Sequence, residues 1–150
     1  DFYYGLNLKL SYKNWDFGFN GHGNIGYKVF NDFASNHSSA YFDVNAGNLP
    51  NFATAVKRTG FKGISSDYQY YSDFYLEDAS FFRMDDINLG YTFKDLRNWE
   101  GNIRVAASCQ NVFVISNYSG IDPEINSADG VDRSFWPRPR TFSLRLNVNF

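Results

Sequence analysis

Polar and apolar residues alternate one by one over the first part of the chain. From Tyr4 to Tyr12 the even positions are apolar or aromatic, whereas the odd positions are glycine or polar. After the dipeptide Lys13–Asn14 the alternation begins again at Trp15 and continues to Lys28. A period of two residues is typical of a β-strand with one apolar and one polar face. The pattern therefore predicts two long antiparallel strands joined in a tight hairpin.

Three further segments alternate in the same way. The first, Ile87 to Phe93, has a sequence that allows it to extend back to Phe81. The second runs from Ile103 to Gln110, and the third, Phe142 to Phe150, ends the sequence. Four of the five predicted strands reach the roughly 9 to 11 residues that a tilted strand needs to cross a bilayer. Strands of soluble proteins are usually shorter, with about 5 to 6 residues.

The charged residues of these segments lie on the polar faces, and the central parts of the apolar faces carry none. This distribution is expected when one face borders a water-filled lumen and the other borders lipid. Tyr12, Trp15 and Trp99 lie at strand ends beside short turns, where aromatic rings rest at the level of lipid headgroups. We therefore predict an all-β fold, a transmembrane antiparallel β-barrel. The residues predicted to face its lumen are Lys9, Asp16, His22, Arg104 and Arg145.

Short and long connections alternate between the predicted strands. Residues 13–14 and 94–101 form short turns, whereas residues 29–80 and 115–140 form long connections. Transmembrane barrels keep short turns on the periplasmic side, so the long connections are predicted to lie outside the cell. Five strands cannot close a barrel, and an open edge in hydrocarbon leaves backbone groups unsatisfied. Residues 1–150 are therefore interpreted as the carboxy-terminal fragment of a longer barrel, whose first and last strands pair with missing sequence.

Composition supports strands with one apolar and one wet face. Aromatic residues make up 20% of the chain, with 16 Phe and 11 Tyr, and the net charge is −2. No basic cluster is present that would neutralise a run of phosphates, so nucleic acid is not an expected partner. The single cysteine excludes an internal disulfide and a zinc site of several cysteines. No signal peptide or apolar run long enough for a transmembrane helix is visible.

Two motifs suggest chemistry but have simpler structural interpretations. The segment Gly21–Gly26 matches the dinucleotide-binding pattern, yet strand alternation runs through it and no helix follows, which favours a glycine-rich strand. Asp85 and Asp86 form an acidic pair of the kind used in glycoside hydrolysis. Adjacent residues of a regular strand point to opposite faces, so we interpret this pair as charges at a strand end near the membrane boundary.

Other candidate groups also have simpler interpretations. The segment from Asp122 to Asp132 is rich in carboxylates but lacks the glycine and glutamate of a calcium loop, so only an irregular cation site stays open. Cys109 is predicted to be an apolar filler on the outward face, and His22 to be hydrated near Asn20 and Asn24. We expect no metal, cofactor or catalytic residue.

The long connections contain aromatic and basic residues suited to a polar ligand. Tyr118, Trp136 and Tyr71 are candidates for stacking on sugar rings, and Arg138 lies near them in the sequence. Packing of the loops against one another is the favoured role for these rings. A short helix is also predicted for residues 49–60, because a proline stands near its start and Gly60 at its end.

Several segments together resemble the end of SusC/RagA-type TonB-dependent outer-membrane transporters of Bacteroidetes. The resemblance covers essentially the whole chain and is carried by Tyr75–Phe93, Gln110–Phe113, Tyr118–Glu124 and Pro137–Phe150. It implies a 22-stranded barrel plugged by an amino-terminal domain, of which these would be the last five strands. It also implies energy from the TonB complex, a SusD-like lipoprotein lid, and import of oligosaccharides or, less often, peptides. The terminal Phe150 resembles the aromatic end that the outer-membrane assembly machinery recognises.

Two other classes of protein stay open at this point. A soluble β-sandwich acting as a carbohydrate-binding module also has alternating strands, but its aromatic residues point inward. An outer-membrane enzyme barrel needs a nucleophile with a base, and none can be placed on the polar faces.

Overall fold

The computed structural model describes residues 1–37, 72–94, 101–125, 129–133 and 136–150. These residues divide into two compact units, and each is described by itself. The sheet unit comprises Asp1–Gly26, Ser80–Ser116 and Arg138–Phe150, and the loop unit comprises Tyr27–Ala79 and Asn117–Pro137. In the described part of the chain, no helix has both the length and the apolar character needed to cross a membrane.

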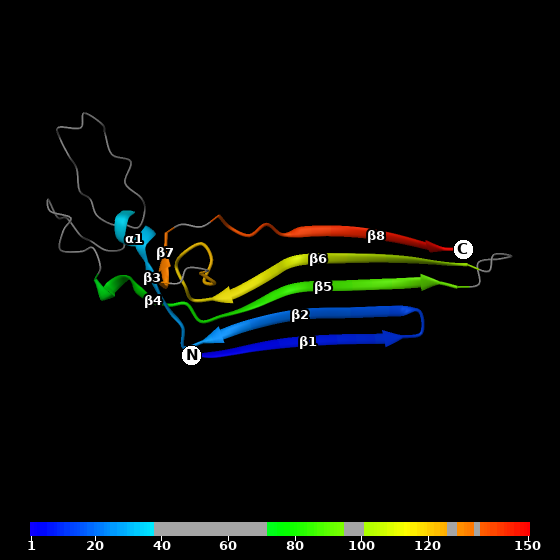
Figure 1. The fold of residues 1–150 in the computed structure, drawn as a ribbon, viewed down its shortest axis with the longest axis horizontal. Helices are drawn as coiled ribbons and strands as arrows, with labels where there is room; N and C mark the ends of the chain where they lie inside the picture. The colour runs from blue at the N-terminus through cyan, green and yellow to red at the C-terminus, as the bar shows by residue number, and fades with distance from the viewer. Residues whose placement is uncertain (38–71, 95–100, 126–128, 134–135) are drawn as a thin grey trace, which may run out of the picture. The chain divides into compact units, whose positions relative to one another are not determined.

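One five-stranded antiparallel sheet forms the sheet unit. Its strands follow the order β1-β2-β5-β6-β8, and Figure 1 shows them side by side. The strands are β1 (Phe2–Tyr12), β2 (Trp15–Ile25), β5 (Phe81–Phe93), β6 (Asn102–Ser116) and β8 (Thr141–Asn149). All five predicted strands are present, and their lengths of 9 to 15 residues confirm the prediction of long strands.

Two strand ends differ from the prediction. β2 ends at Ile25 instead of continuing to Lys28, because Gly26 adopts a φ of 81° and turns the chain away. β6 continues to Ser116 and is thus longer than the predicted segment, which ended at Gln110. The additional part of β6 pairs with the first residues of β5, so the two longest strands lie next to each other.

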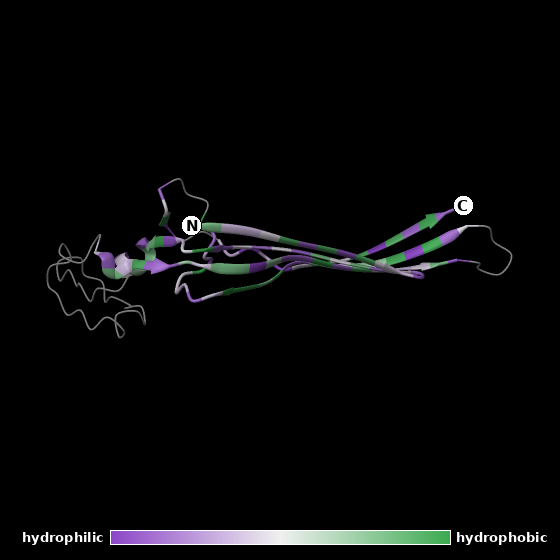
Figure 2. Cartoon of the chain, turned by 90° about the horizontal axis from the view of Figure 1, so that it is seen from below, coloured by the Kyte–Doolittle hydropathy of each residue, from purple (hydrophilic) through white to green (hydrophobic). Residues whose placement is uncertain are grey.

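The apolar face of the sheet is exposed. Leu6 on β1 is 52% exposed and Leu144 on β8 is 78% exposed. Bands of hydrophobic and hydrophilic residues alternate along the strand that leads to the carboxy terminus (Figure 2). In a soluble sandwich these apolar side chains would form the interior between two sheets. The structure therefore does not support the soluble carbohydrate-binding module.

A β-bulge interrupts the regular alternation on β5. Met84 and Asp86 lie opposite Gly21 and Asn20, which are adjacent on β2, so Asp85 is an extra residue on β5. The extra residue reverses which side chains point to each face. Before the bulge Phe81 and Arg83 lie on the polar face, whereas after it the even-numbered residues do.

Gly23 confirms the structural interpretation of the glycine-rich segment. The strand β2 continues through Gly21 and Gly23 to Ile25, and no helix opens there. The rings of Tyr4 and Phe82, on the two neighbouring strands, stack with their centroids 6.3 Å apart. A Cβ atom on Gly23 would lie 2.5 Å from the Tyr4 ring. Glycine at this position therefore leaves room for aromatic rings to cover the strand.

A small three-stranded sheet organises the loop unit. Its order is β4-β3-β7, with β3 antiparallel to β4 and parallel to β7. The elements are β3 (Lys28–Asn31), α1 (Asp32–His37), the 3-10 helix η3 (Asp73–Tyr75), β4 (Leu76–Asp78) and β7 (Val131–Asp132). Val29, Ala79 and Tyr118 form its core, against which Tyr27 and Ile125 pack. The predicted helix at 49–60 lies outside the described residues.

Candidate functional site: the polar face of the sheet

The five residues predicted to face a lumen lie on one face of the sheet. Lys9 lies opposite Gly18 in the pairing of β1 with β2. Asp16 lies opposite Gly90, which in turn lies opposite Ala106 on β6. Across the last pair of strands, Arg145 lies opposite Ala106. Arg104 lies opposite Thr92, and His22 lies opposite Gly5. These pairings place both side chains on the same face as the other three. That this shared face borders a lumen stays a prediction.

A hollow of about 500 Å³ lies on this polar face. It spans β1, β2, β5 and β6, and its lining combines Leu8 and Phe19 with amide and charged side chains. The polar side chains that line it are Asn7, Lys9, Asp16, Asn20, Asn88 and Arg104. Such a surface remains wetted, and it offers both hydrogen-bond donors and acceptors to a polar molecule passing over it.

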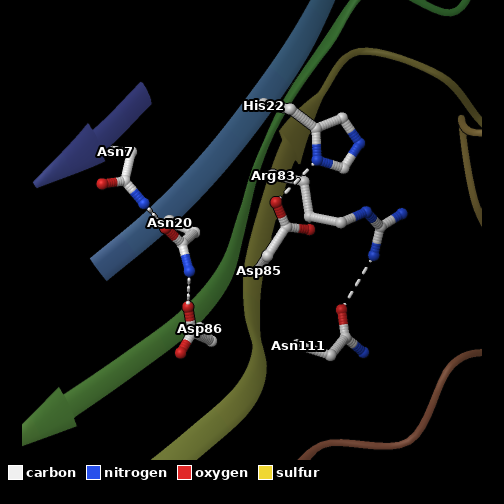
Figure 3. A network of polar contacts seen from close by, with 7 residues as sticks. All are labelled: Asn7, Asn20, His22, Arg83, Asp85, Asp86 and Asn111. Carbon is white, nitrogen blue, oxygen red and sulfur yellow. Dashed lines mark hydrogen bonds and ion pairs between the residues drawn. The ribbon is translucent and has the colours of Figure 1, made fainter. Parts of the chain in front are cut away.

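A row of side-chain hydrogen bonds crosses three strands at the centre of the face. The Asn7 amide on β1 donates to the Asn20 amide oxygen on β2, and Asn20 donates to the Asp86 carboxylate on β5 (Figure 3). Asn88 Nδ2 lies 3.5 Å from the other Asp86 oxygen. Because Asn20 accepts a hydrogen bond from β1 and donates one to β5, the row fixes these side chains relative to one another and to the sheet.

An ion pair bridges β2 and β6 over the strand between them. Arg104 donates to both carboxylate oxygens of Asp16, with 3.0 Å between Nε and Oδ1. A Cβ atom on Gly90, which lies between them on β5, would be 2.5 Å from the Arg104 guanidinium and 2.6 Å from the Asp16 carboxylate. The absence of a side chain at Gly90 is therefore what allows this bidentate pair to form.

The bulge brings His22 and Asp85 together. Their Nδ1 and Oδ2 atoms are 2.7 Å apart, and the His22 ring also packs edge-on against Phe81 and near Tyr3. The interpretation of Asp85 and Asp86 as strand-end charges on opposite faces is wrong. Both lie within β5, and because Asp85 is the bulged residue, both carboxylates reach partners on the polar face (Figure 3). His22 is correspondingly paired with Asp85 and not simply hydrated beside its asparagine neighbours.

Asn111 joins three segments of the sheet unit. Its side chain accepts a hydrogen bond from Arg83 at 2.8 Å and donates to the backbone oxygen of Arg138 at 2.7 Å. The Arg140 side chain donates to the Asn111 backbone oxygen at 3.4 Å. Asn111 has a φ of 51°, a conformation that asparagine tolerates better than most residues. The Arg83 side chain, only 3% exposed, is thereby held on the polar face.

The four ligand candidates of the long connections differ in position. Tyr118 is 9% exposed and donates to Asp132 at 2.6 Å, which favours packing of the loop unit over contact with substrate. Burial, together with the hydrogen bond to Asp132, raises the pKa of Tyr118 far above its usual value. Trp136 is 93% exposed and thus accessible to a ligand. Arg138 is exposed in the sheet unit, and Tyr71 lies outside the described residues.

The carboxylates of the predicted cation segment have partners within the loop unit. Asp122 accepts a hydrogen bond from the Glu124 backbone, Asp129 pairs with Arg133 at 2.6 Å, and Asp132 binds Tyr118. Across the described ranges, no three histidine, cysteine or acidic residues are arranged to hold a metal ion. This segment therefore contributes to loop structure through hydrogen bonds.

Sequence reasoning missed the residues that connect the polar face. The alternation marks Asn7, Asn20 and Asn88 only as polar positions, and it does not distinguish Arg83 or Asn111 from their neighbours. One signal is present, since Phe81–Asp86 contains two aromatic and two acidic neighbours and thus breaks the alternation. Such a break within a long strand is typical of a bulge.

Known proteins of similar sequence match almost the entire chain. TonB-dependent receptor SusC of Bacteroides thetaiotaomicron is 39% identical over 155 residues, which cover 97% of this chain and 15% of the relative. The chain belongs with the SusC/RagA-type TonB-dependent receptors. TonB-dependent receptor P26 of Formosa agariphila is 31% identical over 172 residues, covering 100% of this chain and 17% of the relative. No protein-family model matches the chain.

The fold agrees with this SusC/RagA assignment. The solved structure of the RagAB peptide transporter aligns with a TM-score of 0.75 at 17% identity, covering 97% of this chain and 17% of the other. The predicted fold class, part of a transmembrane β-barrel, and the predicted outer-membrane location are confirmed. The chain spans only about a sixth of the length of these SusC/RagA relatives.

Proposed function

We propose that this chain is the carboxy-terminal wall segment of an outer-membrane importer that takes up a nutrient with energy from the TonB complex. The observation that carries the proposal is a single sheet with an exposed apolar face and an internally hydrogen-bonded polar face, in a chain 39% identical to SusC. The apolar face contacts lipid, and the polar face lines the passage. The curated relatives are named as receptors, which agrees with a role that involves no catalysis.

Further strands of the same polypeptide complete the wall in this proposal. In the described sheet, β1 and β8 each pair with a single neighbouring strand, so each presents one edge without a partner there. In hydrocarbon such an edge costs several kcal/mol for each unsatisfied backbone group. In this proposal residues 1–150 form one segment of the barrel wall, and the plug and the segment that contacts TonB belong to other parts of the protein.

The orientation follows from the connections between strands. The turn between β1 and β2 comprises Lys13 and Asn14, and the connection between β5 and β6 is also short. Both leave from the same end of the sheet, because Thr92 donates a backbone hydrogen bond to Asn14 at 2.9 Å. In the proposed orientation this end faces the periplasm, and the loop unit belongs to the outside of the cell.

We infer that the imported nutrient is an oligosaccharide. Its hydroxyl groups match the amide-rich lining of the hollow, where Asn7, Asn20 and Asn88 lie beside Lys9 and Arg104. A peptide is the second candidate, because RagAB is named as a peptide transporter. A SusD-like surface lipoprotein is the proposed partner on the outer side.

A deletion of the full-length gene tests the proposed import. The deletion strain is expected to lose growth on one or a few defined oligosaccharides as sole carbon source, while growth on glucose is unchanged. Restoration by the wild-type gene is the control for the deletion itself. Growth loss confined to peptide mixtures would replace the oligosaccharide with a peptide, and unchanged growth on every oligosaccharide and peptide would overturn the importer.

A further inference from the structure

A second hollow, of about 490 Å³, lies on the apolar face of the sheet near the short-turn end. Its wall is aromatic on one side, where Trp15 packs edge-on against Tyr91 and Tyr91 against Phe93, each pair with centroids 4.7 Å apart. Leu89 and Leu144 flank the other side. No carboxylate belongs to the described lining, so the hollow accepts a hydrocarbon chain without burying a charge.

The hollow exists because a small residue interrupts a row of large ones. Leu89, Ala107 and Leu144 lie opposite one another on three adjacent strands, and Ala107 is the smallest of the three. A methyl group between two leucine side chains leaves a depression on a face that is otherwise covered by larger apolar groups. In the proposed barrel this face borders lipid, so the depression is continuous with the acyl-chain region of the membrane.

Two lysines lie at the same end of the sheet as the aromatic wall. Lys13 is exposed at the turn between β1 and β2, with its Nζ 5.3 Å from the centre of the Tyr12 ring. Lys94 is exposed and directly follows Phe93, which lines the hollow. The backbone hydrogen bond from Thr92 to Asn14 brings the end of β5 next to the turn between β1 and β2. Aromatic rings at this level mark the boundary between hydrocarbon and headgroups, so the lysines lie where lipid phosphates are found.

We propose that the hollow and the two lysines form a binding site for an anionic glycerophospholipid. One acyl chain lies over Ala107 between the leucines, and the headgroup phosphate lies at Lys13 and Lys94. Apolar shape alone would accept any lipid chain, whereas the paired positive charges select for an anionic headgroup. The site rests on the outer-membrane location of the sheet, and it does not depend on which nutrient is imported.

Native mass spectrometry of the purified full-length transporter tests this site. The protein is titrated in detergent with phosphatidylglycerol and, in parallel, with zwitterionic phosphatidylcholine. We expect Ala107→Phe to abolish the tightest-binding lipid for both headgroups, because the ring fills the depression. The double variant K13Q/K94Q is expected to weaken phosphatidylglycerol binding about tenfold and to leave phosphatidylcholine unchanged.

Matched controls separate the site from general effects on the barrel. Leu6→Phe adds bulk elsewhere on the apolar face, and Lys28→Gln removes a lysine of the loop unit; both are expected to bind lipid as the wild type does. A folded barrel unfolds on heating and then changes its mobility in a gel. The same heat-dependent shift in each variant shows that the variant is assembled. The proposal would be overturned if Ala107→Phe bound lipid as well as the wild type does, or if the protein showed no preference for the anionic lipid. Detection of a second copy of the protein, and no bound lipid, would also overturn it.

Discussion

The sheet unit and the loop unit are stabilised in different ways. Among the described residues, the loop unit contains four of the buried hydrophobic residues, Val29, Tyr75, Ala79 and Tyr118, whereas the sheet unit contains one, Phe81. The sheet unit instead exposes leucines along its outer strands and satisfies its polar groups across one face. The loop unit thus resembles a small water-soluble protein, with a core that excludes solvent.

The same apolar residue types therefore have different roles in the two units. In the loop unit burial of side chains stabilises the structure, because it removes apolar surface from water. In the sheet unit the backbone hydrogen bonds provide the order, and lipid replaces a protein core. The effect of a substitution in the sheet unit therefore depends on the face that carries the residue. In the loop unit it depends on how deeply the side chain is buried.

The largest expected effect comes from a charge on the apolar face of the sheet. Phe142→Arg is expected to destabilise the full-length barrel by about 2–4 kcal/mol, because the guanidinium would lie in hydrocarbon, four residues along β8 from the level of Trp15 and Tyr91. Ser143→Arg, one residue further along β8 and opposite Ser108, places the same charge on the polar face and is expected to have little effect. Urea unfolding in lipid vesicles measures both. Equal destabilisation by the two variants would contradict the separation of the faces.

A smaller effect is expected from one hydroxyl group in the loop unit. Tyr118→Phe removes the hydroxyl that donates to the buried Asp132 carboxylate and is expected to cost about 1–3 kcal/mol of loop stability. Hydrogen exchange of β3 and β7 in the full-length protein measures this loosening. Tyr12→Phe, at an exposed ring of β1, is the matched control and should leave exchange unchanged. Unaltered exchange in the Tyr118 variant would show that this bond does not stabilise the loop.

Alkaline pH is expected to act on the same hydrogen bond. Because the pKa of Tyr118 is raised in the folded loop, the folded state keeps its proton above the unfolded value of about 10. The resulting stabilisation is complete below that pH and decreases above it, by up to about 1.4 kcal/mol per pH unit. Hydrogen exchange of β3, corrected for the intrinsic rate at each pH, should therefore accelerate once the pH exceeds about 10. The Tyr118→Phe variant should lack this acceleration, and an equal acceleration in both proteins would assign it to another group.

The smallest expected effect concerns the ion pair on the polar face. Gly90→Ala places a methyl group between Asp16 and Arg104, and their separation should cost less than about 1 kcal/mol, since both side chains are partly exposed. Gly5→Ala, which has open space around the added methyl group, is the matched control on β1. Urea unfolding of the full-length barrel measures the difference. A loss several times larger would show that the pair is a main support of the wall.

The strands and their faces were predictable because both follow from local alternation. Five strands, the shared face of Lys9, Asp16, His22, Arg104 and Arg145, and the outward position of Cys109 opposite Ile87 all agree with the sequence pattern. The regular strand period carries this information without any knowledge of distant contacts.

The bulge and the loop unit were not predictable in the same way. Asp85 reverses the period within β5, and the β2 residues that its segment contacts, His22 and Asn20, are more than sixty residues away in the sequence. The parallel pairing of β3 with β7 likewise joins segments about a hundred residues apart. Such non-local contacts leave little trace in a local pattern. The buried Tyr118 and the exposed Trp136 show that a candidate ligand residue found from composition still needs its environment to be judged.

One face of this sheet is expected to contact lipid tails and the other to contact water. Spin labels placed singly from Ile103 to Cys109 on β6 of the full-length transporter, in lipid vesicles and with Cys109 otherwise replaced by serine, test this most directly. We expect collision with oxygen at Ile103, Val105, Ala107 and Cys109, and with a water-soluble nickel complex at Arg104, Ala106 and Ser108. Accessibility to oxygen and nickel that lacks this two-residue period would contradict the assignment of the two faces. Labels at the odd positions that are shielded from both reagents would also contradict it.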